Sequence, residues 1–467
     1  MNKKGCPYLT ESTAKNPFSM KNPFIFLLFA CLSHSLHGQK LDWFALNDCA
    51  DFINPQFLEV DTAGNSYIIG KFKGETFFHS ATPEGPKHHT YTSSSWQRTF
   101  LLKYDSAGNL LYFINMYGTS SNGNYADPRA FIMLSDGRLA LAAYTENGIY
   151  TRDATGSEQT IRGNDEMMLL VFSTEGKLLS GTPLGLKNTS KMIEDSVGNL
   201  YFAGVKKSYS REIPAVFLLK KGEKELLRLP APDSAVIDIE LKNEKLWFLT
   251  SDESTGRFRS GSQSFSLYEL TSSEAGQSYL RHFTKTFNGH HNATVSLLNQ
   301  SGDIEVLLQI TKQEKAVLTL SDNPVNHFKQ NGIFLFQHNG NIKSHLDLDN
   351  VHGNLFRLQS RKNGGYLASA FARENIYLGG KDSIVVQPQP DYYWEKFVLI
   401  FDSSLKLERY SSLGSSNSDY YQCNPQEVKG KLYFSAILVN FGHFGGVYKE
   451  LNWKAGFYVA RFGGLMD

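Results

Sequence analysis

The feature that most constrains this chain is a repeated pair of hairpins. In Leu58–Gly74, "LEVDTAGNSYIIGKFKG", apolar residues flank a tight turn, and Leu101–Phe113, "LLKYDSAGNLLYF", repeats the arrangement. Similar halves follow along the rest of the chain, so that each unit offers four short strands. Repetition of this kind, without sustained helical spacing, indicates a repeat architecture of small antiparallel sheets.

Seven such units can be read in the sequence, starting roughly sixty residues apart. Four short strands in each unit match the content of a β-propeller, in which every blade is one four-stranded sheet. The predicted fold is therefore all-β: a seven-bladed β-propeller that forms a single domain over residues 39–467. The blades are predicted at about 57–118, 129–185, 191–229, 235–283, 294–348, 355–414 and 424–464.

The last unit ends one strand early, and the missing strand is predicted at the other end of the chain. Leu41–Leu46 precedes the first unit as a fourth strand precedes each later one. We expect this segment to pair beside Phe457–Phe462 and so to complete the seventh blade. A ring closed by both ends of the chain leaves no open sheet edge at the junction.

The composition is that of a β-rich globular protein. Aromatic residues make up 13% of the chain and charged residues 20%, with 39 Gly and 15 Pro, which argues against disorder and against a collagen-like chain. Lys and Arg total 47 against 46 Asp and Glu, and there is no long basic run. Neither a nucleic-acid partner nor an anionic membrane surface is therefore predicted.

The first 38 residues are predicted to be a leader that directs export. Met20 offers an alternative start, since a short basic stretch and the apolar run Pro23–Leu32 follow it. That run is too short to span a bilayer, so we expect cleavage near Gly38 and an exported protein that is periplasmic, cell-surface or secreted. A lipoprotein acylated at Cys31 is the alternative. No later segment is long and apolar enough to cross a membrane.

The Asp-x-x-Gly-Asn turns are predicted to be structural. A calcium site is the alternative, but calcium takes about six oxygens, and each turn supplies one Asp and one Asn. Asp accounts for the turn by accepting backbone N–H bonds and Gly by adopting a positive φ. Other units replace the Asp by Ser135, Ser173, Asn299 or His338. The three clearest turns comprise Asp61, Gly64 and Asn65; Asp105, Gly108 and Asn109; and Asp195, Gly198 and Asn199.

A family resemblance rests on two of these turns. Val60–Phe78, "VDTAGNSYIIGKFKGETFF", and Glu194–Gly204, "EDSVGNLYFAG", resemble the SBBP-type β-propeller repeat of secreted bacterial proteins. The other units match more loosely, and Lys242–Lys245 lacks the Gly. The resemblance implies the propeller fold for most of the chain and carries no catalytic residues. The leader resembles those of exported proteins of Bacteroidetes-like bacteria.

The candidate ligand-binding residues are aromatic. If the Asp-x-x-Gly-Asn hairpins lie on one face of the ring, the longer connections gather on the opposite face. Exposed aromatic rings suit stacking on sugars or anchoring a protein partner, although they also serve to pack loops. The candidates are Tyr91, Trp96, Tyr125, Tyr150, Tyr392, Tyr393, Trp394, Tyr420 and Tyr421.

Two cysteines remain outside the predicted leader. Cys49 and Cys423 stand just before the first strands of units one and seven, which are neighbours in a closed ring. In an oxidising compartment, a disulfide bond between them would close the junction. Two unrelated buried thiols are the alternative.

The sequence favours a non-catalytic binding or scaffold protein that takes a protein or glycan ligand, acts as a monomer and uses neither metal nor cofactor. It contains no nucleophile elbow, zinc motif or phosphate-binding loop. Carboxylates converging near the central channel would instead make a carbohydrate-active enzyme, a glycoside hydrolase or polysaccharide lyase, which is the alternative kept open. A structural component of an envelope complex is a third interpretation.

Overall fold

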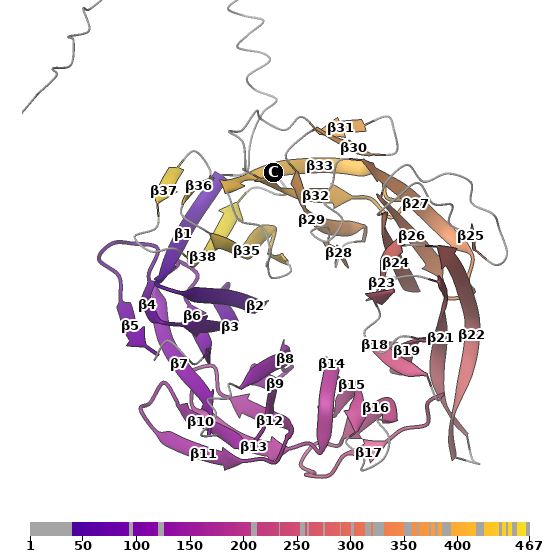
Figure 1. The fold of residues 1–467 in the computed structure, drawn as a ribbon, viewed down its shortest axis with the longest axis horizontal. Helices are drawn as coiled ribbons and strands as arrows, with labels where there is room; N and C mark the ends of the chain where they lie inside the picture. Colours follow the sequence, from indigo (N-terminus) through magenta and orange to yellow (C-terminus); the bar gives the residue numbers. More distant parts are fainter. Residues whose placement is uncertain are drawn as a thin grey trace, which may run out of the picture. The chain divides into compact units, whose positions relative to one another are not determined.

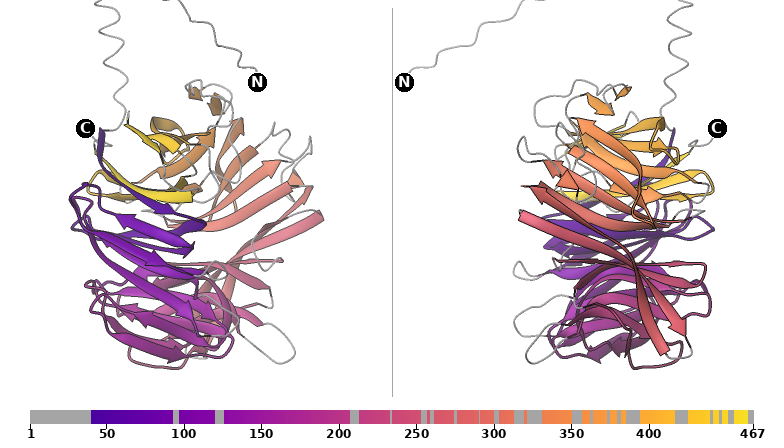
Figure 2. Two further views of the ribbon diagram at one scale, coloured as in Figure 1. Left: turned by 60° about the vertical axis from the view of Figure 1, so that its left-hand side comes forward. Right: turned by 90° about the vertical axis from the view of Figure 1, so that its right-hand side faces the viewer.

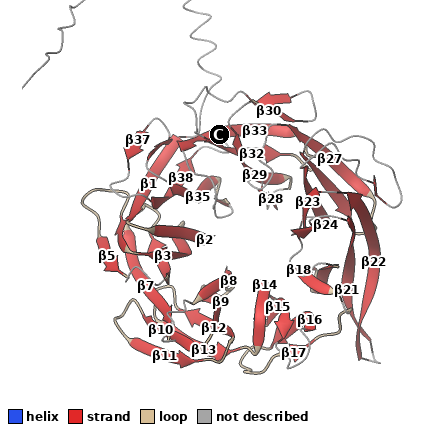
Figure 3. Cartoon of the chain, in the orientation of Figure 1, coloured by secondary structure: helices blue, strands red, loops and turns tan. Residues whose placement is uncertain are grey.

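The computed structural model describes the residues of one propeller. The described residues are 40–92, 97–119, 126–206, 213–232, 234–252, 257–258, 261–273, 276–289, 291–299, 303–312, 319–320, 331–349, 357–361, 364–372, 375–378, 382–384, 394–416, 425–438, 441–444, 447–450 and 455–463. The chain divides into two compact units, Met1–Gly38 and Gln39–Asp467. Strands and loops make up the described part of the second unit (Figure 3).

Seven antiparallel sheets lie around a central axis in the second unit, so the predicted seven-bladed propeller is confirmed (Figure 1). The first three blades, from the innermost to the outermost strand, are β2 (Phe52–Val60), β3 (Ser66–Lys73), β6 (Arg98–Tyr104) and β7 (Leu110–Gly118); β8 (Asp127–Met133), β9 (Leu139–Thr145), β12 (Glu166–Phe172) and β13 (Leu178–Pro183); and β14 (Leu186–Glu194), β15 (Leu200–Lys206), β16 (Ile213–Leu219) and β17 (Leu227–Arg228).

The remaining four blades follow the same order. They are β18 (Ala235–Lys242), β19 (Lys245–Ser251), β21 (Gly261–Ser273) and β22 (Gly276–Gly289); β23 (His291–Asn299), β24 (Ile304–Lys312), β26 (Asn331–Gln337) and β27 (Ile342–Asp349); β28 (Arg357–Ser360), β29 (Tyr366–Ala372), β32 (Trp394–Phe401) and β33 (Leu407–Ser416); and β34 (Gln426–Val428), β35 (Lys431–Leu438), β38 (Ala455–Gly463) and β1 (Lys40–Cys49). Figure 2 shows the twist of these sheets in two further views.

The N-terminal strand completes the seventh blade, as predicted. β1 pairs antiparallel with β38, with Leu41 opposite Phe462 and Leu46 opposite Tyr458. At the seam with blade one, the indole Nε1 of Trp43 donates to the Ser106 carbonyl oxygen at 3.1 Å. The ring is therefore closed by one sheet that contains both ends of the propeller, and a side chain of that sheet is bonded to the next blade.

Strands also form where the sequence analysis expected only long loops. Among the described residues, the connection between the second and third strands of four blades folds into a hairpin that extends the outer edge of the preceding blade. These hairpins are β4 (Glu75–His79) and β5 (Lys87–Tyr91) on β1; β10 (Gly148–Arg152) and β11 (Glu158–Arg162) on β7; β30 (Ile376–Leu378) and β31 (Asp382–Ile384) on β27; and β36 (Phe441–Phe444) and β37 (Val447–Glu450) on β33.

Two single strands in the same kind of connection bind their neighbours differently. β25 (Thr319–Leu320) extends the outer strand β22 of blade four. β20 (Arg257–Phe258) pairs with β23, the innermost strand of blade five. Neighbouring blades are thus joined by backbone hydrogen bonds as well as by side-chain packing.

The core is distributed between the blades rather than concentrated at the centre. Successive residues of one strand serve different interfaces: Ile68 of β3 belongs to the cluster between blades seven and one, and Ile69 to the cluster between blades one and two. Among the described residues, each of the seven blade interfaces has its own hydrophobic cluster. Inner strands with both faces covered therefore consist of nearly continuous apolar residues.

The Asp-x-x-Gly-Asn turns are held by their own side chains. Oδ1 of Asp61 accepts hydrogen bonds from the backbone N–H groups of Ala63 and Asn65, both at 2.9 Å, and Oδ2 accepts from the Asn65 amide at 2.7 Å. Gly64 has a φ of 87°, which a side chain would strain. Asp105 and Asp195 make the same three bonds. These bonds occupy both carboxylate oxygens of each Asp.

Candidate functional site

The inner strands of three consecutive blades enclose a cavity of about 260 Å³ beside the central axis. It is lined by residues of β2, β8 and β14 together with Gln426 of β34. These strands end their sheets, so their inner edges have no strand partner. The cavity wall therefore combines backbone edges with the side chains that point between the blades.

Glu59 is the one carboxyl among the residues that line this cavity. It lies near the end of β2, opposite Tyr67 of β3, on the strand face that also carries Phe57. Burial raises the pKa of Glu59 to about 8. Its carboxyl makes no hydrogen bond or ion pair with another described residue. At neutral pH Glu59 is therefore a protonated acid with unused hydrogen-bonding capacity.

The two basic residues of the cavity wall are already paired. Arg129 of β8 lies 2.5 Å from Asp127, measured from Nη2 to Oδ2, and Asp127 also contacts the Lys71 ammonium. Lys191 Nζ of β14 lies 2.9 Å from Asp238 Oδ1, and it also contacts Glu240. Burial lowers the pKa of Lys191, but the two carboxylates outweigh this and hold its pKa above the usual range. These pairs connect blades one to two and three to four.

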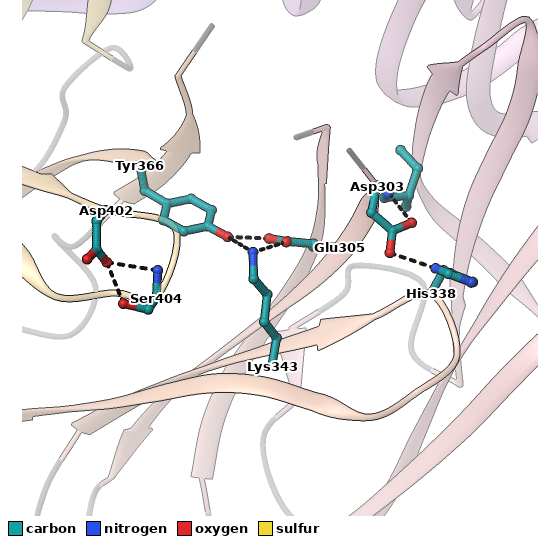
Figure 4. A network of polar contacts seen from close by, with 8 residues as sticks. Asp303, Glu305, His338, Lys343, Tyr366, Asp402 and Ser404 are labelled. Atoms are coloured by element: carbon teal, nitrogen blue, oxygen red, sulfur yellow. Dashed lines mark hydrogen bonds and ion pairs between the residues drawn. The ribbon is translucent and has the colours of Figure 1, made fainter. Parts of the chain in front are cut away.

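A second polar network joins blades five and six (Figure 4). Glu305 of β24 is 2% exposed, and its Oε1 accepts a hydrogen bond from Lys343 Nζ of β27 at 2.6 Å. The hydroxyl of Tyr366 on β29 donates to Oε2 of the same carboxylate. Burial and Glu305 raise the pKa of Tyr366 above its ordinary range. Every group is satisfied by another, so this network serves to hold two blades together.

Two imidazole–carboxylate pairs flank Trp247 near the junction of blades four and five. His282 Nε2 lies 3.1 Å from Glu269 Oε2, and His338 Nδ1 lies 2.6 Å from Asp303 Oδ2. The two imidazole centroids are 6.0 Å apart. Over the described ranges, no three His, Cys, Asp or Glu side chains are arranged to hold a metal ion.

The structure does not bring the predicted aromatic residues together where it describes them. Tyr91 ends β5 and is 63% exposed, in the sheet of blade seven. Tyr150 lies in β10, in the sheet of blade one, with its ring centroid 4.6 Å from that of Tyr117. Both lie in outer hairpins rather than loops. Trp394 begins β32. The side chain of Trp394 and the residues Trp96, Tyr125, Tyr392, Tyr393, Tyr420 and Tyr421 lie outside the described residues.

Cys49 is a free and buried thiol, so the predicted disulfide bond is not formed. Cys49 is enclosed within its sheet, between Ala455 of β38 and Thr76 of β4. Its sulfur accepts a hydrogen bond from Thr76 Oγ1 at 3.1 Å and lies 3.1 Å from the Lys73 carbonyl oxygen. The hairpin β4–β5, which was not predicted from the sequence, lies directly beside Cys49. Cys423 lies outside the described residues.

Glu59, Arg129 and Lys191 were not predicted as site residues from the sequence. The available signal was a charged residue within an otherwise apolar inner strand, as in "FLEV" for Glu59. That signal does not tell which charges meet, since the three residues belong to three blades. No helix in the described part of the chain has the length and apolar character needed to cross a membrane.

The chain resembles solved propeller structures in fold. The propeller of Dos1 shares 11% identity at a TM-score of 0.43, over 91% of this chain and 95% of that one. Virginiamycin B lyase from Staphylococcus aureus shares 11% identity at a TM-score of 0.34, over 72% of this chain and 95% of that one. Drosophila Plexin A, solved in complex with Semaphorin 1b, shares 6% identity at a TM-score of 0.38, over 91% of this chain and 87% of that one. At such low identities and TM-scores, the similarity concerns the propeller fold and says nothing about function.

The sequence matches no known protein-family profile. It also matches no curated protein. The resemblance to the SBBP-type repeat therefore stays a prediction that rests on Val60–Phe78 and Glu194–Gly204, and the resemblance to exported proteins of Bacteroidetes-like bacteria one that rests on the leader. What the structure establishes about the chain's class is that it is a seven-bladed β-propeller.

Proposed function

We propose that the protein is an exported, non-catalytic binding module that holds a protein or glycan ligand. The observation that carries this proposal is the composition of the channel cavity. The described residues that line it include one carboxyl, Glu59, and neither Tyr nor His. Glycoside hydrolysis ordinarily requires a pair of carboxyls on either side of the scissile bond, and acid–base lyase chemistry requires a second proton-transferring group.

The basic residues of the cavity also support binding rather than catalysis. Arg129 and Lys191 are each held by carboxylates, which fixes their positions and keeps them charged. A rigid wall of this kind suits recognition of a group that enters from the channel. The exposed ring of Tyr91 offers additional contact area on an outer hairpin, away from the cavity.

Screening the purified chain on a glycan array, and in pull-downs from the proteins of its own cell envelope, tests the proposal. We expect saturable binding to one of these two classes of ligand, with no chemical change in the ligand. Turnover of a polysaccharide by the purified chain, together with failure to retain either class of ligand, would contradict the proposal and favour the carbohydrate-active alternative.

A further inference from the structure

We propose that the channel cavity binds a cationic group of the ligand, a primary ammonium or a guanidinium, with Glu59 as its counter-ion. This inference rests on the proposed binding function, because it names the chemistry that the same cavity recognises. A lysine or arginine side chain of a protein and the ammonium of an amino sugar both supply such a group. A cavity of about 260 Å³ is large enough for one side-chain end or one sugar ring.

The charges around the cavity balance when Glu59 is left out. The three basic groups are Lys71, Arg129 and Lys191, and they contact three carboxylates, Asp127, Asp238 and Glu240. The hydroxyl of Tyr67, which lies opposite Glu59 on β3, donates its hydrogen bond to Oδ2 of Asp61 rather than to Glu59. Among the described residues that line the cavity, an ionised Glu59 is therefore the one charged group without an ion-pair partner, and a cation in the cavity would neutralise it.

The rest of the wall also offers acceptors to a group that only donates hydrogen bonds. β2, β8 and β14 are terminal strands of their sheets, so their inner edges present backbone carbonyl oxygens alongside N–H groups. Ammonium and guanidinium groups have donors and no acceptor. The amides of Gln56 and Gln426, which line the same cavity, both donate and accept hydrogen bonds, so they do not select for a cation. The carboxyl is what distinguishes the site.

Binding a cation here is linked to the release of a proton. Burial raises the pKa of Glu59 to about 8, so the free protein carries the protonated acid at neutral pH. When the cation enters, the carboxyl loses its proton to water and the carboxylate pairs with the ligand. We therefore expect affinity to rise by up to about tenfold per pH unit below pH 8, and to level off above it until the ligand itself loses its charge.

The experiment is isothermal titration of the full chain with Nα-acetyl-lysine amide and with glucosamine, at pH 6, 7 and 8. Glucose and N-acetylglucosamine are the neutral comparisons. We expect at least one cationic probe to bind, the lysine derivative to bind more tightly at higher pH with proton release seen as buffer-dependent heat, and the neutral sugars not to bind. The two cationic probes distinguish a protein source of the group from a glycan source.

Two variants complete the test. Glu59→Gln keeps the size and polarity of the side chain, and we expect it to fold and to lose cation binding together with its pH dependence. Glu223→Gln makes the same change at an exposed turn outside the cavity and should bind as the unmodified chain does. Equal binding of neutral and cationic probes, no binding of any probe, or unchanged binding by Glu59→Gln would each overturn the inference.

The failure of this inference is distinguishable from failure of the binding function. The array or pull-down could identify a ligand that Glu59→Gln binds with unchanged affinity and pH dependence. The protein would then be a binding module whose cavity does not recognise a cation. If the chain instead turns over a polysaccharide and retains nothing, the proposed function itself is wrong.

Discussion

Two carboxyls that stand two residues apart show how surroundings decide what an acidic residue does. Asp61 accepts three hydrogen bonds within its own turn, from two backbone N–H groups and one amide. Glu59 points between two blades, makes no such bond, and has its pKa raised to about 8 by burial. The first residue stabilises a turn locally. The second has no such partner, so ionising it would destabilise the free protein, and in the proposed complex the cationic ligand supplies the missing partner.

The free energy of unfolding should depend on pH in a way that reflects the raised pKa of Glu59. The carboxyl of Glu59 has a pKa of about 8 in the folded chain, against 4.5 for an ordinary Glu. The folded state therefore keeps a proton that the unfolded state releases, so this stabilisation is complete below pH 4.5 and is lost as pH rises through 8. The free energy of unfolding should fall by up to about 1.4 kcal/mol per pH unit across this window.

Urea unfolding of the unmodified chain and of Glu59→Gln at pH 5, 6, 7 and 8 measures this effect. Other groups titrate equally in both proteins, so the difference between the two isolates Glu59. We expect the unmodified chain to lose stability relative to Glu59→Gln as pH rises. Parallel pH profiles would show that Glu59 titrates normally in the fold.

The hydroxyl of Tyr366 should contribute measurably to the junction between blades five and six. Tyr366→Phe removes the hydrogen bond to the buried carboxylate of Glu305 while leaving the ring and the Lys343 pair in place. A hydrogen bond to a charged group is worth about 1.5–3 kcal/mol, so we expect a loss of that size in urea unfolding. Tyr377→Phe, at an exposed position on β30, is the matched control and should change little. Equal, small effects would mean that Tyr366 does not secure this junction.

At the scale of elements, each blade depends on chain segments that belong to its neighbour. β1 supplies the outer strand of blade seven, and the hairpin β4–β5 of blade one then pairs with β1. Hairpins extend blades one, five and six in the same way. The exposed edges that a propeller blade would otherwise present are thus partly covered, which lowers the risk of pairing with another chain.

Removal of β1 should be far more damaging than removal of the residues before it. A chain that begins at Ala50 lacks the partner of β38 and the inward-packing Trp43 and Ala45. We expect a large fall in thermal stability, measured by circular dichroism, or loss of the cooperative transition. A chain that begins at Lys40 is the control and should melt like the full chain. Matching transitions for both shortened chains would show that β1 is not needed to close the ring.

The sequence carried enough local information to predict the turns, the blade count and the closing strand. Turn residues such as Asp61 and Gly64 act within a few residues of themselves, and the strand alternation around them is equally local. The hairpins β4–β5 and β10–β11 were missed because they form by pairing with strands of the preceding blade. The predicted disulfide bond is not formed: Cys49 is a free thiol beside β4, and its predicted partner Cys423 lies outside the described residues.

The candidate site was less predictable than the fold because its residues come from different blades. Some seventy residues separate Glu59 from Arg129, and some sixty separate Arg129 from Lys191. Nothing in the sequence shows that these three residues line one cavity. The aromatic residues were easier to notice, yet Tyr91 and Tyr150 lie in two different sheets. Whether the aromatic residues bind a ligand therefore stays a prediction, and most of them lie outside the described residues.

At the scale of the whole molecule, the propeller is a closed ring of blades with a cavity beside its central axis. Its interfaces are packed between blades, so the frame holds the inner strands fixed while leaving their edges open to the channel. Among the described residues, the cavity has one acid, Glu59, without an ion-pair partner, and two basic groups already held in ion pairs. We infer that such a cavity recognises a ligand rather than transforms it.

The most direct test of that claim is to incubate the purified chain with an excess of each ligand that it retains on the array or in the pull-down, and to follow both bound and released material by mass spectrometry. We predict saturation at a fixed stoichiometry, with every ligand recovered chemically unchanged. Recovery of cleaved or rearranged product in many-fold excess over the protein, and its loss in Glu59→Gln, would show that the channel is an active site and would contradict the account.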